Sequence, residues 1–319
     1  MQTTIDPPAH STTSPAQRLR ISTTAVRVSM RWLDVRKSLT PEQKNQAAET
    51  FNAEGDFLSA RKKLLDTRHQ AYKEVTAVRG KIVSYWRALT LPYPEPGIRL
   101  IKQSQVEAFN QQMLEFREDL ATAVTKLDEH YGELKAAARR RLGALYNPAD
   151  YPTSLAGLFS VEWDFPSVEP PDYLLQLSPA IYEQERARVA ARFEEAVQLT
   201  EQAFIAEIAK LVSHLTERLS GTEDGQKKIF RDSAVENLTE FFERFRQLNV
   251  RSNPELEALV QQAQRIVEGH EAQALRDNDL IRQQVATDLS RVQAALDGMM
   301  VDVPRRRIIR SGGTNAPGH

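Results

Sequence analysis

The chain has 319 residues, of which 42 are basic and 43 acidic, and 41% are hydrophobic. Because the charges nearly cancel, no overall field directs the protein toward nucleic acid, an acidic lipid surface or another polyanion. The lack of cysteine excludes disulfides, thiolate nucleophiles and cysteine-bound metal sites, and it fits a cytoplasmic protein. No run of about 18 apolar residues is present, so the sequence predicts a soluble protein without membrane contact.

The N-terminal part of the chain predicts a leader, a strand and two helices. Residues 1–20 contain three prolines and are expected to form a flexible leader. Alternating apolar and polar side chains predict a half-buried strand over Ala25 to Leu33. A capping threonine, a helix-start proline and a glutamine three residues after the cap predict a short helix from Thr40 to about Asn52. A longer helix is predicted from Phe57 to about Thr90, where the proline-rich segment LPYPEPG ends it.

The clearest pattern in the sequence runs from Ser104 to Tyr146, where apolar residues recur on average every 3.6 positions for 43 residues. One continuous helix of this length would measure about 64 Å. We expect it to return antiparallel to the preceding helix, with a short strand over Gly97 to Lys102 at the tip of the hairpin. A rod with one apolar stripe is unstable alone in water, so the fold should depend on helix packing.

The second half of the chain begins with a proline- and aromatic-rich connector, in which Leu158 to Phe165 is the expected strand. A third long helix is predicted from Ala180 to Leu219, followed by three shorter helices over 233–248, 254–268 and 272–300. The predicted fold class is mainly α: a long antiparallel, coiled-coil-like helical hairpin and a helix bundle, with a small β element of a few short strands gathered at one end. The expected divisions are a leader (1–20), the hairpin, connector and third long helix (21–220), a C-terminal helical subdomain (221–304) and a basic flexible tail (305–319).

No pattern in the sequence points to catalysis. The four histidines outside the tails fall on four different predicted helices, and none has the HExxH spacing of a zinc site. The pair Gly80-Lys81 lacks the first glycine of a phosphate-binding loop, and no Glu-x-x-His pair of a di-iron bundle occurs. We therefore predict no catalytic, cofactor-binding or metal-binding residue, no cofactor and no enzyme activity.

Two groups of side chains are candidates for partner contacts. The strongest local positive charges are Arg139, Arg140, Arg141, Arg305, Arg306 and Arg307. These arginines are either solvated structural residues or contacts to nucleic acid or an acidic partner, and the first three are spread around a helix by about 100° each. The aromatic candidates are Trp86, Tyr93, Tyr151, Trp163 and Phe165. They form either a small core where strands meet helix ends or an exposed protein-binding surface.

Two parts of the sequence resemble a family of uncharacterised helical proteins from bacteriophages and bacterial mobile elements. The first is YWRALTLPYPEPGIRL with RRRLGALYNPADYP, and the second is IFRDSAVENLTEFFERFRQLNVRSNPELEALVQQAQ with LRDNDLIRQQVATDL and PRRRI; together they cover about residues 60 to 310. No catalytic motif is known for this family, so the resemblance implies no catalytic residues in this chain. Some proteins of this general kind are encoded beside an AAA+ ATPase and a von Willebrand A protein, which implies an adaptor role.

From these observations the sequence predicts a non-enzymatic interaction or scaffold protein of phage or mobile-element type. Its partner would be a protein, either a second copy of the chain or an AAA+ ATPase, held on an extended helical surface. The alternative is a nucleic-acid-binding accessory factor that uses the arginine patches.

Overall fold

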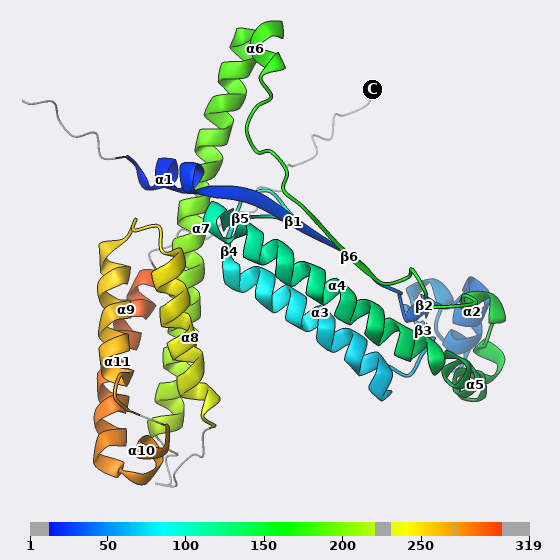
Figure 1. The fold of residues 1–319 in the computed structure, drawn as a ribbon. Helices are drawn as coiled ribbons and strands as arrows, with labels where there is room; N and C mark the ends of the chain where they lie inside the picture. The colour runs from blue at the N-terminus through cyan, green and yellow to red at the C-terminus, as the bar shows by residue number, and fades with distance from the viewer. Residues whose placement is uncertain (1–12, 221–230, 271, 302–319) are drawn as a thin grey trace, which may run out of the picture. The chain divides into compact units, whose positions relative to one another are not determined.

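The computed structural model describes residues 13–220, 231–270 and 272–301 and confirms a mainly α fold with a small antiparallel β element (Figure 1). The chain divides into two compact units. Residues 20–192 form one, called here the sheet unit, and the described residues of 1–19 and 193–319 form the other, the bundle unit. The boundary therefore lies inside the third long helix and not after residue 220, where the sequence placed it.

A four-stranded antiparallel sheet is the centre of the sheet unit, with the strand order β4-β5-β1-β6. The central strand confirms the predicted alternation, because Val26 and Val28 are buried whereas Arg27 and Ser29 are exposed. It pairs with β5 through its first half and with β6 through its second half, and Arg27 lies at the change of partner. The strands are β1 (Thr23–Arg31), β4 (Thr90–Pro92), β5 (Ile98–Lys102) and β6 (Ser160–Asp164).

Two antiparallel helices, α3 (Gln70–Leu89) and α4 (Val106–Glu129), pack beside each other and against this sheet (Figure 1). Glu74 near the start of α3 lies 3.9 Å from Lys126 near the end of α4, which confirms the expected hairpin. Its core includes Ile82 of α3 and Phe109 of α4, both fully buried. The 3-10 turn η2 (Gln103–Gln105) leads from β5 into α4.

The first helix of this hairpin is shorter than predicted, because it begins at Gln70 and not at Phe57. The carboxylate of Asp66 accepts a hydrogen bond from the backbone N–H of Arg68 at 3.0 Å, and this turn separates the helix from the preceding strand β3 (Arg61–Lys63). Leu65, one of the expected helix positions, is buried in the same core but lies in the non-helical segment.

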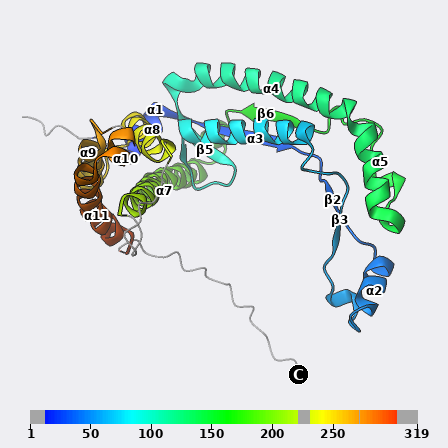
Figure 2. The ribbon, with the colours of Figure 1, turned by 90° about the horizontal axis from the view of Figure 1, so that it is seen from below.

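The predicted 43-residue rod is also wrong as a single helix. It is divided at His130 into α4 and α5 (Tyr131–Leu142), and Figure 2 shows α5 turned away from the axis of α4. Near the break, the Asp128 carboxylate accepts hydrogen bonds from the Ser154 hydroxyl and the Leu155 N–H, both at 2.8 Å. Tyr131, Leu134 and Ala138 of α5 are buried. The apolar spacing of α4 therefore continues beyond the break.

The segment between β1 and α3 forms a second, two-stranded sheet, in which β2 (Arg36–Ser38) pairs with β3. We had expected all strands to lie together at one end, but they form two separate sheets. Helix α2 (Pro41–Glu49) begins with the predicted capping box, in which Thr40 and Gln43 exchange backbone and side-chain hydrogen bonds. The other short elements are the 3-10 turns η1 (Gly55–Phe57), η3 (Gly143–Leu145) and η4 (Pro148–Asp150), and helix α6 (Tyr173–Leu177).

The bundle unit is built from the C-terminal part of α7 (Pro179–Ser220) and the helices that follow it (Figure 1). Phe204 of α7 meets Phe245 of α8 edge-on, with 5.0 Å between the ring centroids. The predicted helix over 272–300 is interrupted, because the Asn278 side chain accepts from the N–H groups of Leu280 and Ile281 and starts a new helix. These helices are α8 (Ser233–Leu248), α9 (Pro254–Val267), α10 (Ala272–Asp277) and α11 (Asp279–Val301).

Part of the expected leader is helical. Residues 1–12 lie outside the described part of the chain, whereas α1 (Pro15–Ser22) buries Ala16 and Leu19. Within the bundle unit, the Arg18 guanidinium donates to the Val250 carbonyl at 3.0 Å, which fixes this segment to the loop after α8. The basic tail over 305–319 lies outside the described residues.

Candidate interaction surfaces

The five aromatic candidates are built into the sheet unit and do not form one exposed patch. Tyr93 is only 6% exposed, and Trp86 is half-buried against the core. The Tyr151 hydroxyl donates to the Leu64 carbonyl at 3.0 Å. Burial is the largest cause that raises the pKa of Tyr151 to about 12.

The two aromatic candidates at β6 also have internal contacts. Trp163 Nε1 donates to Asn110 Oδ1 at 2.9 Å, and the Arg117 guanidinium lies 5.5 Å from the Trp163 ring centroid. Phe165 is 38% exposed and contacts Phe109 edge-on. The geometry thus favours the structural interpretation of these residues over the interpretation as a binding surface.

An exposed apolar surface lies elsewhere, at α6 and the first turn of α7. We define the α6–α7 face by Tyr173, Leu175, Leu177 and Ile181, which are 60%, 48%, 75% and 49% exposed. Four large apolar side chains are thus exposed within nine residues, and Tyr173 and Leu177, which are four residues apart, lie on the same side of α6. The sequence pattern YLLQLSPAI contains these residues, but its first part was assigned to the proline-rich connector and Ile181 to the predicted third long helix, so they were not considered together.

The surroundings of the α6–α7 face contain four acids, three of which are paired with arginines. Residues 165–185 contain no lysine or arginine, and their acidic members are Glu169, Asp172, Glu183 and Glu185. Glu169 is paired with Arg20, and its hydrogen bond is the largest cause that raises the pKa of that arginine. Arg186 lies 3.1 Å from Glu183, and Arg188 lies 2.9 Å from Glu185. Asp172 is therefore the one acid of this border for which no ion pair is found among the described residues.

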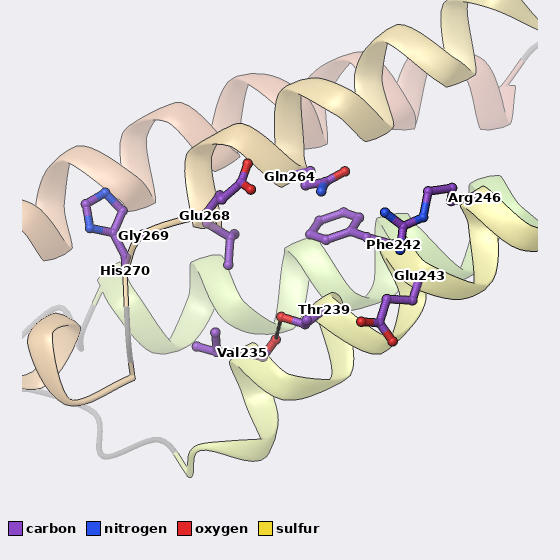
Figure 3. A pocket seen from close by; sticks show the side chains of 10 residues that line it. Val235, Thr239, Phe242, Glu243, Arg246, Gln264, Glu268, Gly269 and His270 are labelled. Carbon is purple, nitrogen blue, oxygen red and sulfur yellow. Dashed lines mark hydrogen bonds between the residues drawn. The ribbon is translucent and has the colours of Figure 1, made fainter.

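A hollow of about 580 Å³ lies between α8 and α9 in the bundle unit (Figure 3). Phe242 lies at its middle, Glu243 and Arg246 lie toward one end, and Glu268 and His270 lie toward the other (Figure 3). No group of three histidine or carboxylate side chains in the described part of the chain is placed to hold a metal ion. This mixture of apolar, acidic and basic groups assigns no particular ligand to the hollow.

The sheet unit carries a concentration of positive charge around the ribbon, the name used here for the β2–β3 pair. Its two strands read Arg-Lys-Ser and Arg-Lys-Lys, so five of its six residues are cationic. Arg36 lies directly opposite Lys63, and Lys37 lies directly opposite Lys62. The ribbon is not predictable from apolar patterning, because each strand is only three residues long and shows no alternating apolar pattern.

The two sides of the ribbon differ in how their charges are compensated. On one side, the carboxylate of Asp150 lies 2.6 Å from Lys37 Nζ and 2.7 Å from Lys62 Nζ. The side chains of Asp150 and Lys62 are 2% and 6% exposed, whereas that of Lys37 is 56% exposed, so the ion cluster consists of a buried pair and one exposed cation. On the other side, no ion pair among the described residues involves Arg36 or Lys63.

Of the three predicted arginines on α5, only Arg141 is drawn into this region. Its Nη1 lies 2.6 Å from Asp66 Oδ2 in a hollow of about 410 Å³ that Lys63 and Arg68 also line. Hydrogen bonds from Arg141 and then from the Arg68 N–H lower the pKa of Asp66 to about 2. Arg139 and Arg140 are exposed, and no ion pair of theirs is found in the described structure. The other predicted arginines, Arg305, Arg306 and Arg307, lie outside the described residues.

Comparison with known proteins gives no family for the chain. No family model matches it, and no curated protein or solved structure is similar to it at a significant level. The resemblance to phage and mobile-element proteins, and the adaptor role that it implies, therefore stay predictions. Among the described helices, none has both the length and the apolar character that crossing a bilayer requires.

Proposed function

We propose that this protein is a non-enzymatic interaction protein and that it binds a basic, apolar segment of a protein partner on its α6–α7 face. The observation that carries the proposal is the exposure of Tyr173, Leu175, Leu177 and Ile181 within nine residues, next to Asp172, an acid for which no ion pair is found among the described residues. Large exposed apolar side chains that share one side of a helix, as Tyr173 and Leu177 do, are typical of a surface that a partner covers.

The energy available at this face is sufficient for binding. Burying a leucine side chain fully is worth about 1.5–3 kcal/mol, and about 1.4 kcal/mol corresponds to a tenfold change in affinity. Leu175 and Leu177 are 48% and 75% exposed, so a partner can still bury a large part of both. Loss of both side chains should weaken binding by about tenfold or more.

Charge favours a basic partner over a second copy of the same face. A two-fold dimer brings identical patches together, so the Asp172 carboxylates of both copies would lie in the same interface. Like charges brought together at an interface disfavour association, whereas a segment carrying lysine or arginine beside its apolar side chains complements Asp172. An amphipathic helix with a basic polar side has this chemistry.

A designed peptide can test this proposal directly. The probe is a fluorescently labelled amphipathic helix made of leucine and lysine, and its control has the same leucine positions with glutamate in place of lysine. We expect the basic peptide to bind the full chain and the acidic peptide to bind at least tenfold more weakly. The variant L175S/L177S should lose most of the binding.

The matched control is F51S/F57S, because Phe51 and Phe57 are 79% and 88% exposed but lie far along the chain from α6. This variant should bind the basic peptide as the unmodified protein does. Equal binding by L175S/L177S, or equal loss in both variants, would remove the support for this face. A dimer that becomes monomeric only in L175S/L177S would instead assign the face to a second copy of the chain.

A further inference from the structure

We infer that the outer side of the ribbon, together with the neighbouring hollow, is a binding site for the phosphate backbone of duplex DNA. The site consists of Arg36, Arg61 and Lys63 on the ribbon and of Arg68 and Arg141 at the hollow. This inference does not rest on the proposed function, because it uses different residues and a partner of opposite charge.

The ribbon contains two pairs of like charges, and the fold compensates only one of them. Like charges directly opposite each other on paired strands destabilise the pairing. The fold compensates the Lys37–Lys62 pair with the buried carboxylate of Asp150. The Arg36–Lys63 pair has no such carboxylate among the described residues, and both side chains are exposed. An external anion can supply the compensation that the chain itself does not provide.

The charges around the outer side leave a positive excess. Arg61 is paired with Asp34 at 3.2 Å, and Asp66 is shared by Arg68 and Arg141. Asp66 remains ionised at neutral pH because its pKa is about 2. Five cations and two carboxylates therefore give this site a local charge of about +3, although the whole chain has a formal charge of −1.

Arginine is the main cation of the site, and its planar fork fits two phosphate oxygens at once. Duplex DNA presents phosphates at a density of one per about 1.7 Å of helix axis. A two-stranded ribbon is also one of the shapes that fit against the DNA grooves. These features favour a duplex over a partner with sparse negative charge.

The segment between β2 and β3 argues against two other anionic partners. Its acidic members Glu42, Glu49, Glu54 and Asp56 outnumber its one cation, Lys44. A flat anionic bilayer that met the ribbon would also meet these acids, so the exposed Phe51 and Phe57 among them are poorly placed as anchors. Single strands need aromatic side chains that stack on bases within a basic groove. The exposed phenylalanines lie instead among carboxylates.

The test measures binding of a labelled 24-base-pair DNA duplex to the full chain by fluorescence anisotropy. Three net contacts predict a loss of affinity of about 40-fold between 50 and 200 mM salt. The variant R36T/K63T should bind about 10²-fold more weakly at 50 mM salt, because it removes two uncompensated cations. Threonine suits a strand, so the ribbon should still form.

The matched control is K73A/K81A, which removes two exposed cations of α3 for which no ion pair is found among the described residues. It should bind DNA within about twofold of the unmodified protein, and L175S/L177S should do the same. Unlabelled duplex should compete better than polyglutamate, and anionic vesicles should not compete. Urea unfolding followed by tryptophan fluorescence checks that R36T/K63T is folded.

Several results would overturn the inference. Absence of binding at 50 mM salt would mean that the ribbon cations serve only to prevent pairing with other strand edges. Equal losses in R36T/K63T and K73A/K81A would mean that attraction is not localised. Stronger competition by polyglutamate or by vesicles would assign the site to an acidic protein or to a membrane surface.

Discussion

Replacing Asp150 with asparagine should destabilise the sheet unit by about 3 kcal/mol, because removal of one partner leaves a buried charge uncompensated. The Asp150 carboxylate lies 2.6 Å from Lys37 Nζ and 2.7 Å from Lys62 Nζ, and only 2% of its side chain is exposed. Lys62 keeps its hydrogen bond to the Leu145 carbonyl at 2.7 Å, but this dipole does not replace a full negative charge. Asparagine preserves the volume of the side chain, so the loss measures charge and not packing.

Tryptophan fluorescence during urea unfolding can follow this unit alone. All three tryptophans and all eight tyrosines of the chain fall within residues 20–192. With a slope of about 2 kcal/mol per molar urea, a loss of about 3 kcal/mol lowers the midpoint by about 1.5 M. The matched control is Asp164→Asn, whose carboxylate is 52% exposed in its pair with Arg27, and its midpoint should move much less.

The pH dependence supplies a second criterion. Burial alone would raise the pKa of Asp150, but the hydrogen bonds from Lys37 and Lys62 outweigh it and hold the pKa below its usual value of 3.8. A carboxylate with a lowered pKa in the folded state contributes stability above its unfolded pKa and loses it as the pH falls through the folded value. The difference between the unmodified protein and Asp150→Asn should thus be complete at neutral pH and shrink below about pH 4. A midpoint shift no larger than that of Asp164→Asn, or a difference that persists at acid pH, would refute the ion cluster.

Three further substitutions have expected effects of different sign and size. Lys63→Thr should stabilise the sheet unit by about 0.2–1 kcal/mol in urea unfolding, because it removes a like charge opposite Arg36. A loss of stability would show that the two charges are already compensated. Thr40→Ala should destabilise the start of α2 by about 1 kcal/mol, because it removes the hydrogen bond that the Thr40 side chain accepts from the Gln43 N–H. In a hydrogen-exchange measurement, exchange should become faster in α2 alone. Arg282→Met should destabilise the bundle unit by about 2 kcal/mol, because Arg282 is 5% exposed and donates a hydrogen bond to the Leu219 carbonyl at the end of α7. The measurement is thermal unfolding followed by circular dichroism, and an unchanged transition would contradict this role.

Sequence reasoning was most reliable where a polar cap and a proline mark the start of a helix. Helices α2, α7 and α9 begin at Pro41, Pro179 and Pro254, each directly after a residue whose side chain can accept a backbone hydrogen bond. At α9, for example, the Asn253 side chain accepts from the Leu256 N–H at 3.0 Å. Such signals are local, so a single sequence contains everything needed to place them.

Helix breaks were missed because apolar spacing continues across them. Asp66, Asp128 and Asn278 lie at or beside these breaks, where each side chain accepts hydrogen bonds from nearby or distant groups. Aspartate and asparagine are also common on exposed helix positions, so their presence alone does not predict an interruption. For Asp128, the decisive partners are Ser154 and Leu155, which lie more than twenty residues away.

The same limit explains why the basic site could not be found from the sequence. Arg36 and Lys63 are separated by an insertion that contains α2, and only the strand pairing places them opposite each other. Arg141 reaches Asp66 because α5 changes direction after His130, whereas the continuous rod expected from the periodicity would have carried its arginines along the axis of α4 (Figure 2). The break in the longest apolar pattern of the chain is thus the feature that brings α5 beside the ribbon. A substitution that joined α4 and α5 into one helix should therefore separate Arg141 from Asp66 and weaken DNA binding, even though every cation of the site would remain.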